Sequence, residues 1–206
     1  PESKPITLPS LEWQVQAWQF VDLASDLLLS DEGQVGREYL LKRGLHPGTW
    51  YAHHLGFANK MQFCNTATNA FGGKTWNCPA IVIPWFDMDS QSETITQIHY
   101  RIIGAKTDKL RTNKQSNIDT ILFGLWDILE SDTTLLLVEG EINALSLWQC
   151  RPRGVSVLSF GSQGFGRADI LQTVAKKYER VFVWCDDATW TMKYQSLLAR
   201  PCQKIQ

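Results

Sequence analysis

The sequence predicts an α/β protein in two parts, a mixed α+β subdomain over residues 1–130 and a parallel α/β sheet over residues 131–206. After residue 130, strand-like and helix-like segments alternate in the order β-α-β-α-β, which is typical of a parallel sheet with crossover helices. The earlier part instead begins with helical patterns and continues with two β-rich segments that predict a hairpin.

The elements expected in the first part are helices at 11–29 and 31–45, a short helix and turn at 46–57, a loop at 65–79, and hairpin strands at 80–87 and 94–103. Ser10 is a suitable helix start, and Gly44 marks the C-cap of the second helix. The loop is expected from its many Asn, Thr and Gly residues. Pro84 predicts an edge position or a strand end, because proline donates no backbone hydrogen bond.

The elements expected in the second part are strands at 134–139, 154–160 and 180–187 and helices at 141–149 and 165–180. The first of these strands is apolar until its last residue, as expected for a parallel strand buried on both faces. In the second helix, Ile170, Val174 and Tyr178 stand four residues apart and form an apolar stripe.

The composition excludes several classes of protein. With 44% hydrophobic and 20% charged residues, the 206-residue chain has an ordinary globular composition, and its apolar runs are far shorter than the roughly 20 residues that span a bilayer. No signal-peptide pattern opens the chain. The five cysteines are odd in number and form no CxxC pair, so we expect reduced thiols in a cytoplasmic protein rather than a zinc finger or a disulfide framework. Because the chain opens on Pro1 and ends abruptly at Gln206, we expect a fragment of a longer protein.

Acidic residues end two of the predicted parallel strands: Glu139 ends the first, and Asp186 and Asp187 end the third. Ligands of open α/β sheets bind at the carboxyl ends of the strands, and carboxylates clustered there suit Mg²⁺ or Mn²⁺. We expect Gly140 to allow a tight turn and Glu141 to be a first-turn residue favoured by the helix dipole. The alternative is that these acids are solvated helix N-caps.

Basic residues gather in and after the second hairpin strand. They are Arg101, Lys106, Lys109, Arg111 and Lys114, with Asp108 as the single acid among them, in a chain of formal net charge −1. Such residues bind nucleic acid through its phosphates without reading its sequence. The alternative is a solvated hairpin and loop. The nine tryptophans also have two interpretations, core packing and, for one or two of them, base stacking.

Three segments of the second part together resemble the Toprim domain, the catalytic α/β module of DnaG-type primases, topoisomerases and some nucleases. They are LLLVEGEINALSL at 135–147, VSVLSFGSQG at 155–164 and RVFVWCDDA at 180–188. Glu139 and Gly140 match the first motif of the family, a Glu-Gly pair at a strand end. Asp186 matches the first Asp of the Asp-x-Asp motif.

Upstream segments narrow the resemblance to the catalytic core of bacterial DnaG-type primases. GREYLLKRGLHPGTWYAHHLGFA at 36–58 resembles the primase helix and its following turn, and YRIIGAKTDKLRTNKQSNIDTILFGL at 100–125 resembles the primase segment that contains PKYLN. Topoisomerases and Toprim nucleases lack this half, which argues against a nuclease. The resemblance covers residues 31–190 and favours a primase of phage or mobile-element type.

The resemblance implies template-directed synthesis of RNA primers from NTPs on single-stranded DNA, with Mg²⁺ or Mn²⁺ as the cofactor. It implies catalytic and metal-binding roles for Glu139 and Asp186, with Asp187 as a substitute metal ligand. It also implies that Arg101 and Lys109 contact nucleotide and template. The chain contains no Walker A motif, so a replicative helicase is expected as a fused or separate partner, and no membrane partner is expected.

Two positions depart from the family pattern. Ala188 stands where the second Asp of Asp-x-Asp falls, and Asn143 stands where an acid is expected four residues after Glu139. A further acidic pair of the family falls beyond Gln206. These departures favour an alternative function, a nucleic-acid-binding module of a mobile-element replication protein with weakened catalysis.

Overall fold

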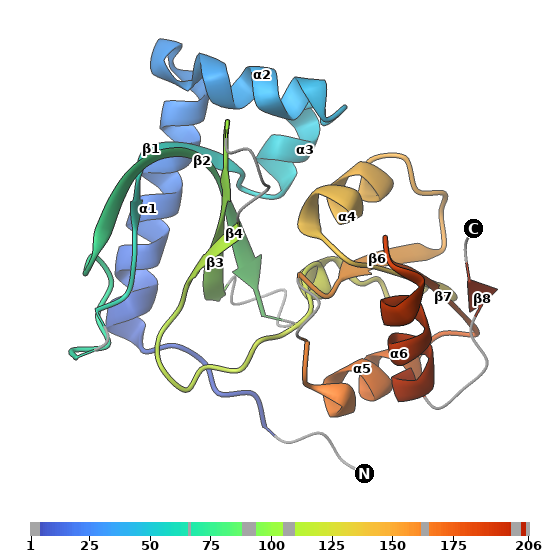
Figure 1. The fold of residues 1–206 in the computed structure, drawn as a ribbon. Helices are drawn as coiled ribbons and strands as arrows, with labels where there is room; N and C mark the ends of the chain where they lie inside the picture. The colour runs from blue at the N-terminus through green and yellow to red at the C-terminus, as the bar shows by residue number, and fades with distance from the viewer. Residues whose placement is uncertain are drawn as a thin grey trace. The chain divides into compact units, whose positions relative to one another are not determined.

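The computed structural model describes residues 5–65, 67–87, 94–104, 110–161, 165–198 and 203–204 (Figure 1). These residues form two compact units, one of residues 7–87 and 94–119 and one of residues 120–204 with residues 5–6. The first unit contains an antiparallel sheet and the second a parallel sheet. The mixed α/β fold class predicted from the sequence is therefore confirmed.

The helices of the first unit precede its sheet. They are α1 (Leu11–Leu29), the short 3-10 helix η1 (Asp31–Gly33), α2 (Gln34–Lys42) and α3 (Pro47–Ala52). Ser10 caps α1, because its hydroxyl accepts the Trp13 N–H at 3.3 Å. Gly44 follows α2 with φ +75°, a left-handed conformation that closes the helix as predicted.

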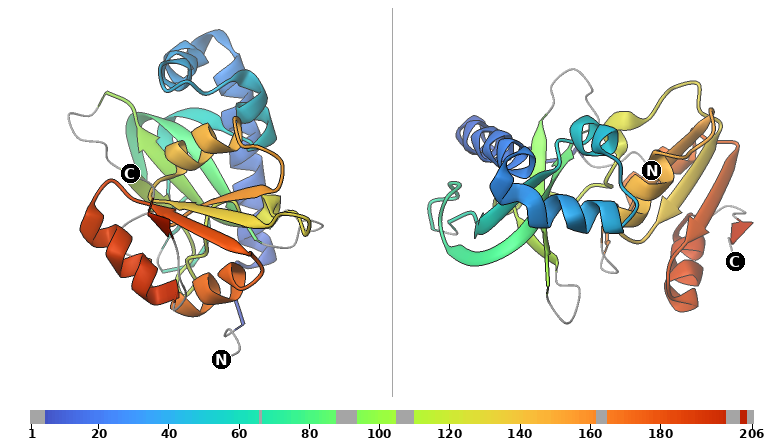
Figure 2. Two further views of the ribbon diagram at one scale, coloured as in Figure 1. Left: turned by 90° about the vertical axis from the view of Figure 1, so that its right-hand side faces the viewer. Right: turned by 90° about the horizontal axis from the view of Figure 1, so that it is seen from above.

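The antiparallel sheet has the strand order β1-β2-β3-β4. Its strands are β1 (Gly56–Gln62), β2 (Thr75–Phe86), β3 (Ile95–Ile102) and β4 (Leu110–Asn113). Helix α1 packs along one face of this sheet (Figures 1 and 2). Trp13 and Phe20 of α1 are buried against this face, where Phe20 meets Tyr100 of β3 edge to face.

The structure differs from the predicted elements of this unit at three strands. Strand β1 overlaps the predicted turn only at residues 56–57, β2 begins at Thr75, inside the predicted loop, and β4 was not predicted. Pro84 lies within β2 rather than at its end, yet it has a partner on one side only. It pairs with Ile98 of β3, whereas the first pair between β1 and β2 joins Gly56 and Val82. Pro84 is thus locally at an edge, where its missing N–H costs no ladder hydrogen bond.

The parallel sheet has the strand order β6-β5-β7-β8. Its strands are β5 (Thr134–Val138), β6 (Val155–Ser159), β7 (Arg180–Trp184) and β8 (Gln203–Lys204), and its helices are α4 (Glu141–Trp148), α5 (Ala168–Ala175) and α6 (Ala188–Leu198). Helix α4 covers one face of the sheet and α5 and α6 cover the other (Figures 1 and 2). This arrangement follows from right-handed crossovers that run in opposite directions across the sheet, from β5 to β6 and then from β6 back past β5 to β7. Helix α6 was not predicted.

The division between the units falls at residues 119–120, before the predicted boundary at residues 130–131. The intervening segment is attached to the parallel sheet. Phe123 forms an isolated antiparallel bridge with Ser159 of β6. Asp127, in the 3-10 helix η2 (Leu125–Asp127), forms an ion pair with Arg151 at 2.7 Å and accepts the indole N–H of Trp148. No helix among the described residues is long and apolar enough to cross a membrane.

Candidate functional site

The carboxyl ends of β5 and β7 bring two predicted site residues together. The strands are neighbours in parallel register, with Val138 opposite Trp184, so the residues that follow them also lie side by side. The Glu139 carboxylate accepts the backbone N–H of Asp186 at 3.3 Å. Glu139 is half-buried and Asp186 is exposed. The two carboxylates therefore occupy one edge of the sheet, where open α/β sheets bind their ligands.

Ser159 at the end of β6 holds the turn that carries Glu139. Its side chain is 0% exposed, and its hydroxyl donates to the Glu139 carbonyl oxygen at 3.0 Å and accepts the Gly161 N–H at 2.9 Å. A backbone bridge to Phe123 fixes Ser159 from the other side. No local sequence signal marks Ser159, because only the register of β5 and β6 shows that it lies beside Glu139.

Gly140 does not have the backbone conformation that was expected of it. Its φ of −121° and ψ of 158° are extended values that any residue adopts, so the turn does not require glycine. Apart from its chain neighbours, no atom of the described residues lies within 4 Å of where a Cβ atom would stand. The absence of a side chain therefore leaves open space beside Glu139.

Asp187 caps helix α6. Its carboxylate accepts the Thr189 N–H at 2.6 Å, and its carbonyl accepts the N–H of Thr191 at 3.1 Å. The N-cap interpretation thus describes Asp187 well. Asp186 has no such capping contact among the described hydrogen bonds, which leaves it the better candidate ligand of the two.

Glu141 is the first residue of α4, in the first-turn position expected for it. Its side chain is 0% exposed, so the interpretation as a solvated N-cap does not apply. Asn143, which stands where the family pattern has an acid, is half-buried in the first turn of α4, two residues after Glu141.

Protonated side chains lie beneath the two carboxylates. The pKa of the Cys185 thiol is raised to about 11, mainly by burial and also by the neighbouring charges of Glu139 and Asp186, against the lowering effect of a hydrogen bond with Thr191. Burial likewise raises the pKa of Tyr194 to about 12. Both groups are therefore neutral at pH 7, and neither supplies positive charge to offset the carboxylates. The edge of the sheet has a negative potential that favours a cation.

The side chains at this edge offer few ligands for a divalent metal. Among the described residues, no group of three or more His, Cys, Asp or Glu side chains is arranged to hold a metal ion. Mg²⁺, however, is usually held by one or two carboxylates, with substrate phosphates and water as its other ligands. Glu139 and Asp186 fit that requirement, because both are carboxylates and the Glu139 carboxylate contacts the backbone of Asp186.

Two of the predicted basic residues, Arg101 and Arg111, lie on opposite faces of the antiparallel sheet. Arg101 of β3 pairs with Leu110, and Arg111 of β4 pairs with Tyr100. Because paired residues share a face and consecutive residues alternate, Arg101 and Arg111 start from opposite faces of the antiparallel sheet. Lys106 and Lys109 lie outside the described residues.

The three basic residues that follow α1 have different surroundings. Arg37 donates to the carbonyl oxygens of Leu28 and Ser30 and so closes the end of α1. Lys42 and Arg43 instead line a hollow of about 450 Å³ with Ile102 and Gly104, next to the end of β3. Lys42 and Arg43 are therefore the better candidates to extend a basic surface from Arg101.

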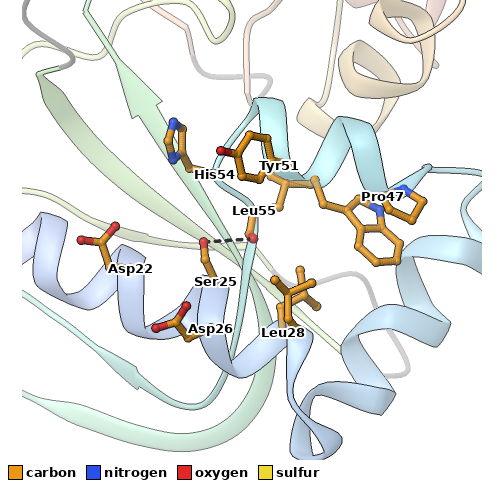
Figure 3. A pocket seen from close by; sticks show the side chains of 10 residues that line it. Asp22, Ser25, Asp26, Leu28, Pro47, Tyr51, His54 and Leu55 are labelled. Atoms are coloured by element: carbon orange, nitrogen blue, oxygen red, sulfur yellow. Dashed lines mark hydrogen bonds between the residues drawn. The ribbon is translucent and has the colours of Figure 1, made fainter.

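A cavity of about 400 Å³ between α1 and α3 has the wrong charge for nucleic acid (Figure 3). Asp22 and Asp26 of α1 lie on one side, and Tyr51 and His54 lie on the other. The two carboxylates would repel phosphate. This cavity was not predicted, and we assign it no role in binding nucleic acid.

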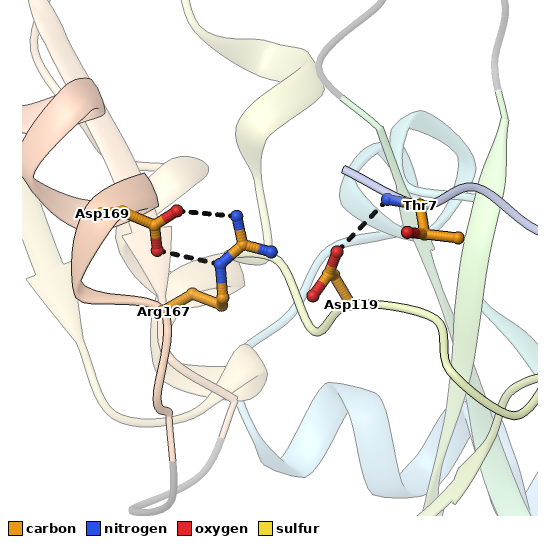
Figure 4. Close-up of polar contacts among 4 residues, drawn as sticks. All are labelled: Thr7, Asp119, Arg167 and Asp169. Carbon is orange, nitrogen blue, oxygen red and sulfur yellow. Dashed lines mark hydrogen bonds and ion pairs between the residues drawn. The ribbon is translucent and has the colours of Figure 1, made fainter. Parts of the chain in front are cut away.

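Two acidic residues near the sheets have structural partners (Figure 4). In the parallel unit, Arg167 donates two hydrogen bonds to Asp169, at 2.8 and 2.7 Å, and this pair lies at the start of α5. In the antiparallel unit, Asp119 accepts the Thr7 N–H at 3.2 Å. Neither contact resembles a catalytic arrangement.

Comparison with known proteins gives one consistent result for the fold. The structure is similar to that of the Aquifex aeolicus primase zinc-binding and RNA polymerase domains, with a TM-score of 0.71 and 19% identity over 94% of this chain and 54% of that one. It is similar to a DNA primase domain from Pseudomonas aeruginosa, with a TM-score of 0.68 and 15% identity over 90% and 65% of the two chains. It is also similar to a DnaG primase catalytic domain bound to single-stranded DNA, with a TM-score of 0.61 and 20% identity over 82% and 63% of the two chains.

These similarities define the fold of the chain as that of the catalytic core of DnaG-type DNA primases. The chain spans about half to two thirds of the length of those structures. No protein-family model matches it, and no curated protein sequence matches it. The resemblance found in the sequence is thus confirmed at the level of the fold.

Proposed function

We propose that this chain is the catalytic core of a DNA primase, which synthesises RNA primers from NTPs on a single-stranded DNA template. The observation that carries the proposal is the contact between Glu139 and the backbone of Asp186 at the carboxyl edge of the parallel sheet. This contact occurs in a chain that shares its fold with primase cores over 94% of its length. One of those structures is described as bound to single-stranded DNA.

Glu139 and Asp186 would hold Mg²⁺ or Mn²⁺ at this edge, with Asp187 next to them in sequence. When bound, such an ion lowers the pKa of a primer hydroxyl and neutralises charge on the NTP phosphates. Ser159 positions Glu139 by holding the carbonyl of the same residue. The half-buried position of Glu139 limits its rotamers and so keeps its carboxylate at the edge of the sheet.

Arg101, Lys109, Arg111 and Lys106 would bind the template or the triphosphate through phosphate contacts, which are independent of base sequence. A replicative helicase, fused or separate, would be the partner that delivers the single strand. A phage or mobile-element origin is part of the same proposal.

A second candidate function is a nucleic-acid-binding module without efficient catalysis. Ala188 and Asn143, which replace two acids of the family pattern, favour it. So does the finding that the described residues form no cluster of three metal ligands.

A primer-synthesis assay on single-stranded DNA with Mg²⁺ or Mn²⁺ separates the two candidates. The primase proposal predicts labelled RNA product from the unaltered chain and none from Glu139→Gln. This substitution keeps the shape of the side chain, so single-strand binding should stay within twofold. Binding without any product from the unaltered chain would favour the second candidate. Product from Glu139→Gln at the level of the unaltered chain would exclude Glu139 as the catalytic acid.

A further inference from the structure

Two positively charged side chains lie over the ring of Trp76, near the start of β2. The Lys74 ammonium nitrogen lies 5.0 Å from the centroid of the Trp76 ring, and the Arg111 guanidinium carbon lies 5.2 Å from it. Both distances are within the range of cation–π attraction. Trp76 is 38% exposed, although Phe63 packs against it edge to face at 6.0 Å. The ring therefore holds two cations together at the surface of the antiparallel unit.

A cavity of about 480 Å³ adjoins Trp76 and its two cations, because Lys74 lies over the Trp76 ring and also lines the cavity. Lys114 provides a second ammonium group to the cavity, and Asn65, Thr112 and Asn113 add amide and hydroxyl groups. Phe63 forms an aromatic side. Asn113 is held rigidly, since its amide oxygen accepts the Cys64 N–H at 2.6 Å. This combination of cations, neutral polar groups and aromatic surface matches the parts of a nucleotide.

No acidic side chain from the surrounding sequence offsets Lys74 and Arg111. Residues 39–86 contain no Asp or Glu, and neither do residues 109–118. Among the described residues, Lys74 and Arg111 form no ion pair with a carboxylate. Cations that are gathered without a counter-charge produce a strong local positive potential, even in a chain of net charge −1.

We propose that Trp76 and this cavity form a subsite for one nucleotide of a single-stranded nucleic acid. Lys74, Arg111 and Lys114 hold the phosphate, and the exposed part of the Trp76 ring stacks on the base. Neither contact distinguishes one base from another, so the subsite binds a strand irrespective of sequence. The subsite deepens the proposed primase function and rests on it, since a template strand is the ligand that this function supplies.

The test measures the affinity of a fluorescently labelled oligothymidylate by anisotropy over a range of salt concentrations. Trp76→Leu is expected to weaken binding at least fivefold, because it removes stacking on one base and the cation–π contacts of Lys74 and Arg111. Lys74→Ala is expected to reduce the slope of log K against log salt by about 0.7, the value for one phosphate contact on a single strand. Lys74 is exposed, so this variant keeps the test valid even if Trp76→Leu does not fold.

Two matched controls accompany these variants. Lys60→Ala removes the same charge from an exposed position on β1, where Lys60 pairs with Asn77 and so starts from the face opposite Trp76. Tyr51→Leu removes an exposed aromatic ring from α3. Both controls should bind the oligonucleotide within twofold of the unaltered chain.

The outcomes separate failure of the subsite from failure of the proposed function. If the unaltered chain binds the strand and makes primers but Trp76→Leu and Lys74→Ala bind like the controls, the subsite is wrong and the primase proposal stands. If those variants lose affinity for a free NTP but not for the oligonucleotide, the cavity holds a free nucleotide and the strand assignment is wrong. If the unaltered chain neither binds the strand nor makes primers, the proposed function fails and the subsite fails with it.

Discussion

The two sheets of this molecule position their functional side chains by different means. In the parallel sheet, β5 and β7 end at the same edge, so Glu139 and Asp186 meet because of topology alone. In the antiparallel sheet, Arg101 pairs with Leu110, the chain neighbour of Arg111. Arg101 and Arg111 therefore start from opposite faces. The strand ends of a parallel sheet bring residues that are distant in the sequence to the same edge. Consecutive charged residues of a hairpin strand are instead divided between its two faces.

The largest difference is expected between single substitutions at the two sheets. Asp186→Asn at the parallel edge should reduce the rate of primer synthesis at least 100-fold, because it removes one of two neighbouring carboxylates. Arg101→Glu in the antiparallel sheet should weaken single-strand binding about tenfold and flatten its salt dependence, with a smaller loss of maximal rate. Steady-state primer synthesis at saturating template measures both. Equal losses of maximal rate would contradict a division of roles between the sheets.

The next largest effect concerns two glycines of the parallel unit. Gly124→Ala should lower the free energy of unfolding by about 3 kcal/mol, because φ is +92° and the new Cβ would lie 2.7 Å from the Val157 carbonyl oxygen. Gly140→Ala should leave it unchanged or raise it by less than about 1 kcal/mol, because the backbone is extended, the space is open and alanine restricts the unfolded chain more than glycine does. Urea denaturation measures both values. Equal destabilisation would show that the turn after Glu139 does depend on glycine.

A smaller effect is expected at the cap of α6. Asp187→Ala should lower the free energy of unfolding by about 1 kcal/mol, the usual contribution of an N-cap side chain. Asp187→Asn should recover most of this loss, because an amide oxygen can accept the Thr189 N–H. If Asp187→Asn is as stable as the unaltered chain but abolishes primer synthesis, Asp187 has a catalytic role beyond that of a cap.

The last effect appears only at alkaline pH, where stability depends on the ionisation of Cys185. The pKa of Cys185 is about 11 in the folded chain and about 8.5 in an exposed thiol, so the folded state binds this proton more tightly. The contribution is fully present below about pH 8.5 and is lost as pH rises toward 11, so the free energy of unfolding falls in that window. Denaturation of the unaltered chain and of Cys185→Ala across this range isolates the contribution of the thiol. Parallel pH profiles for the two proteins would contradict the raised pKa.

The parallel unit could be predicted from sequence more fully than the antiparallel one. The apolar run at 134–138 and the stripe of α5 are local signals, and both elements occur where expected. Strand β1 was missed because GFANKMQ has neither alternation nor β-branched residues, and it forms by pairing with β2 and packing under α1. Tertiary pairing rather than propensity decides this strand.

The same distinction applies to the candidate site. That Glu139 and Asp186 lie at the same edge was predictable, because each follows a strand of one parallel sheet. That their strands are neighbours is seen only in the structure. The role of Ser159 and the contact of Arg111 with Trp76 were not predictable, because they depend on register and on which face a residue occupies. The local sequence does not specify either of these.

The position of bound manganese would show whether the carboxyl edge of the parallel sheet is the catalytic centre. We predict that crystals of the chain soaked with Mn²⁺ show an anomalous difference peak within 2.0–2.5 Å of the Glu139 and Asp186 carboxylates. The peak should disappear in crystals of Glu139→Gln. A chain that makes primers while its manganese lies elsewhere, or that keeps the same peak in Glu139→Gln, would contradict the assignment of this edge as the catalytic centre.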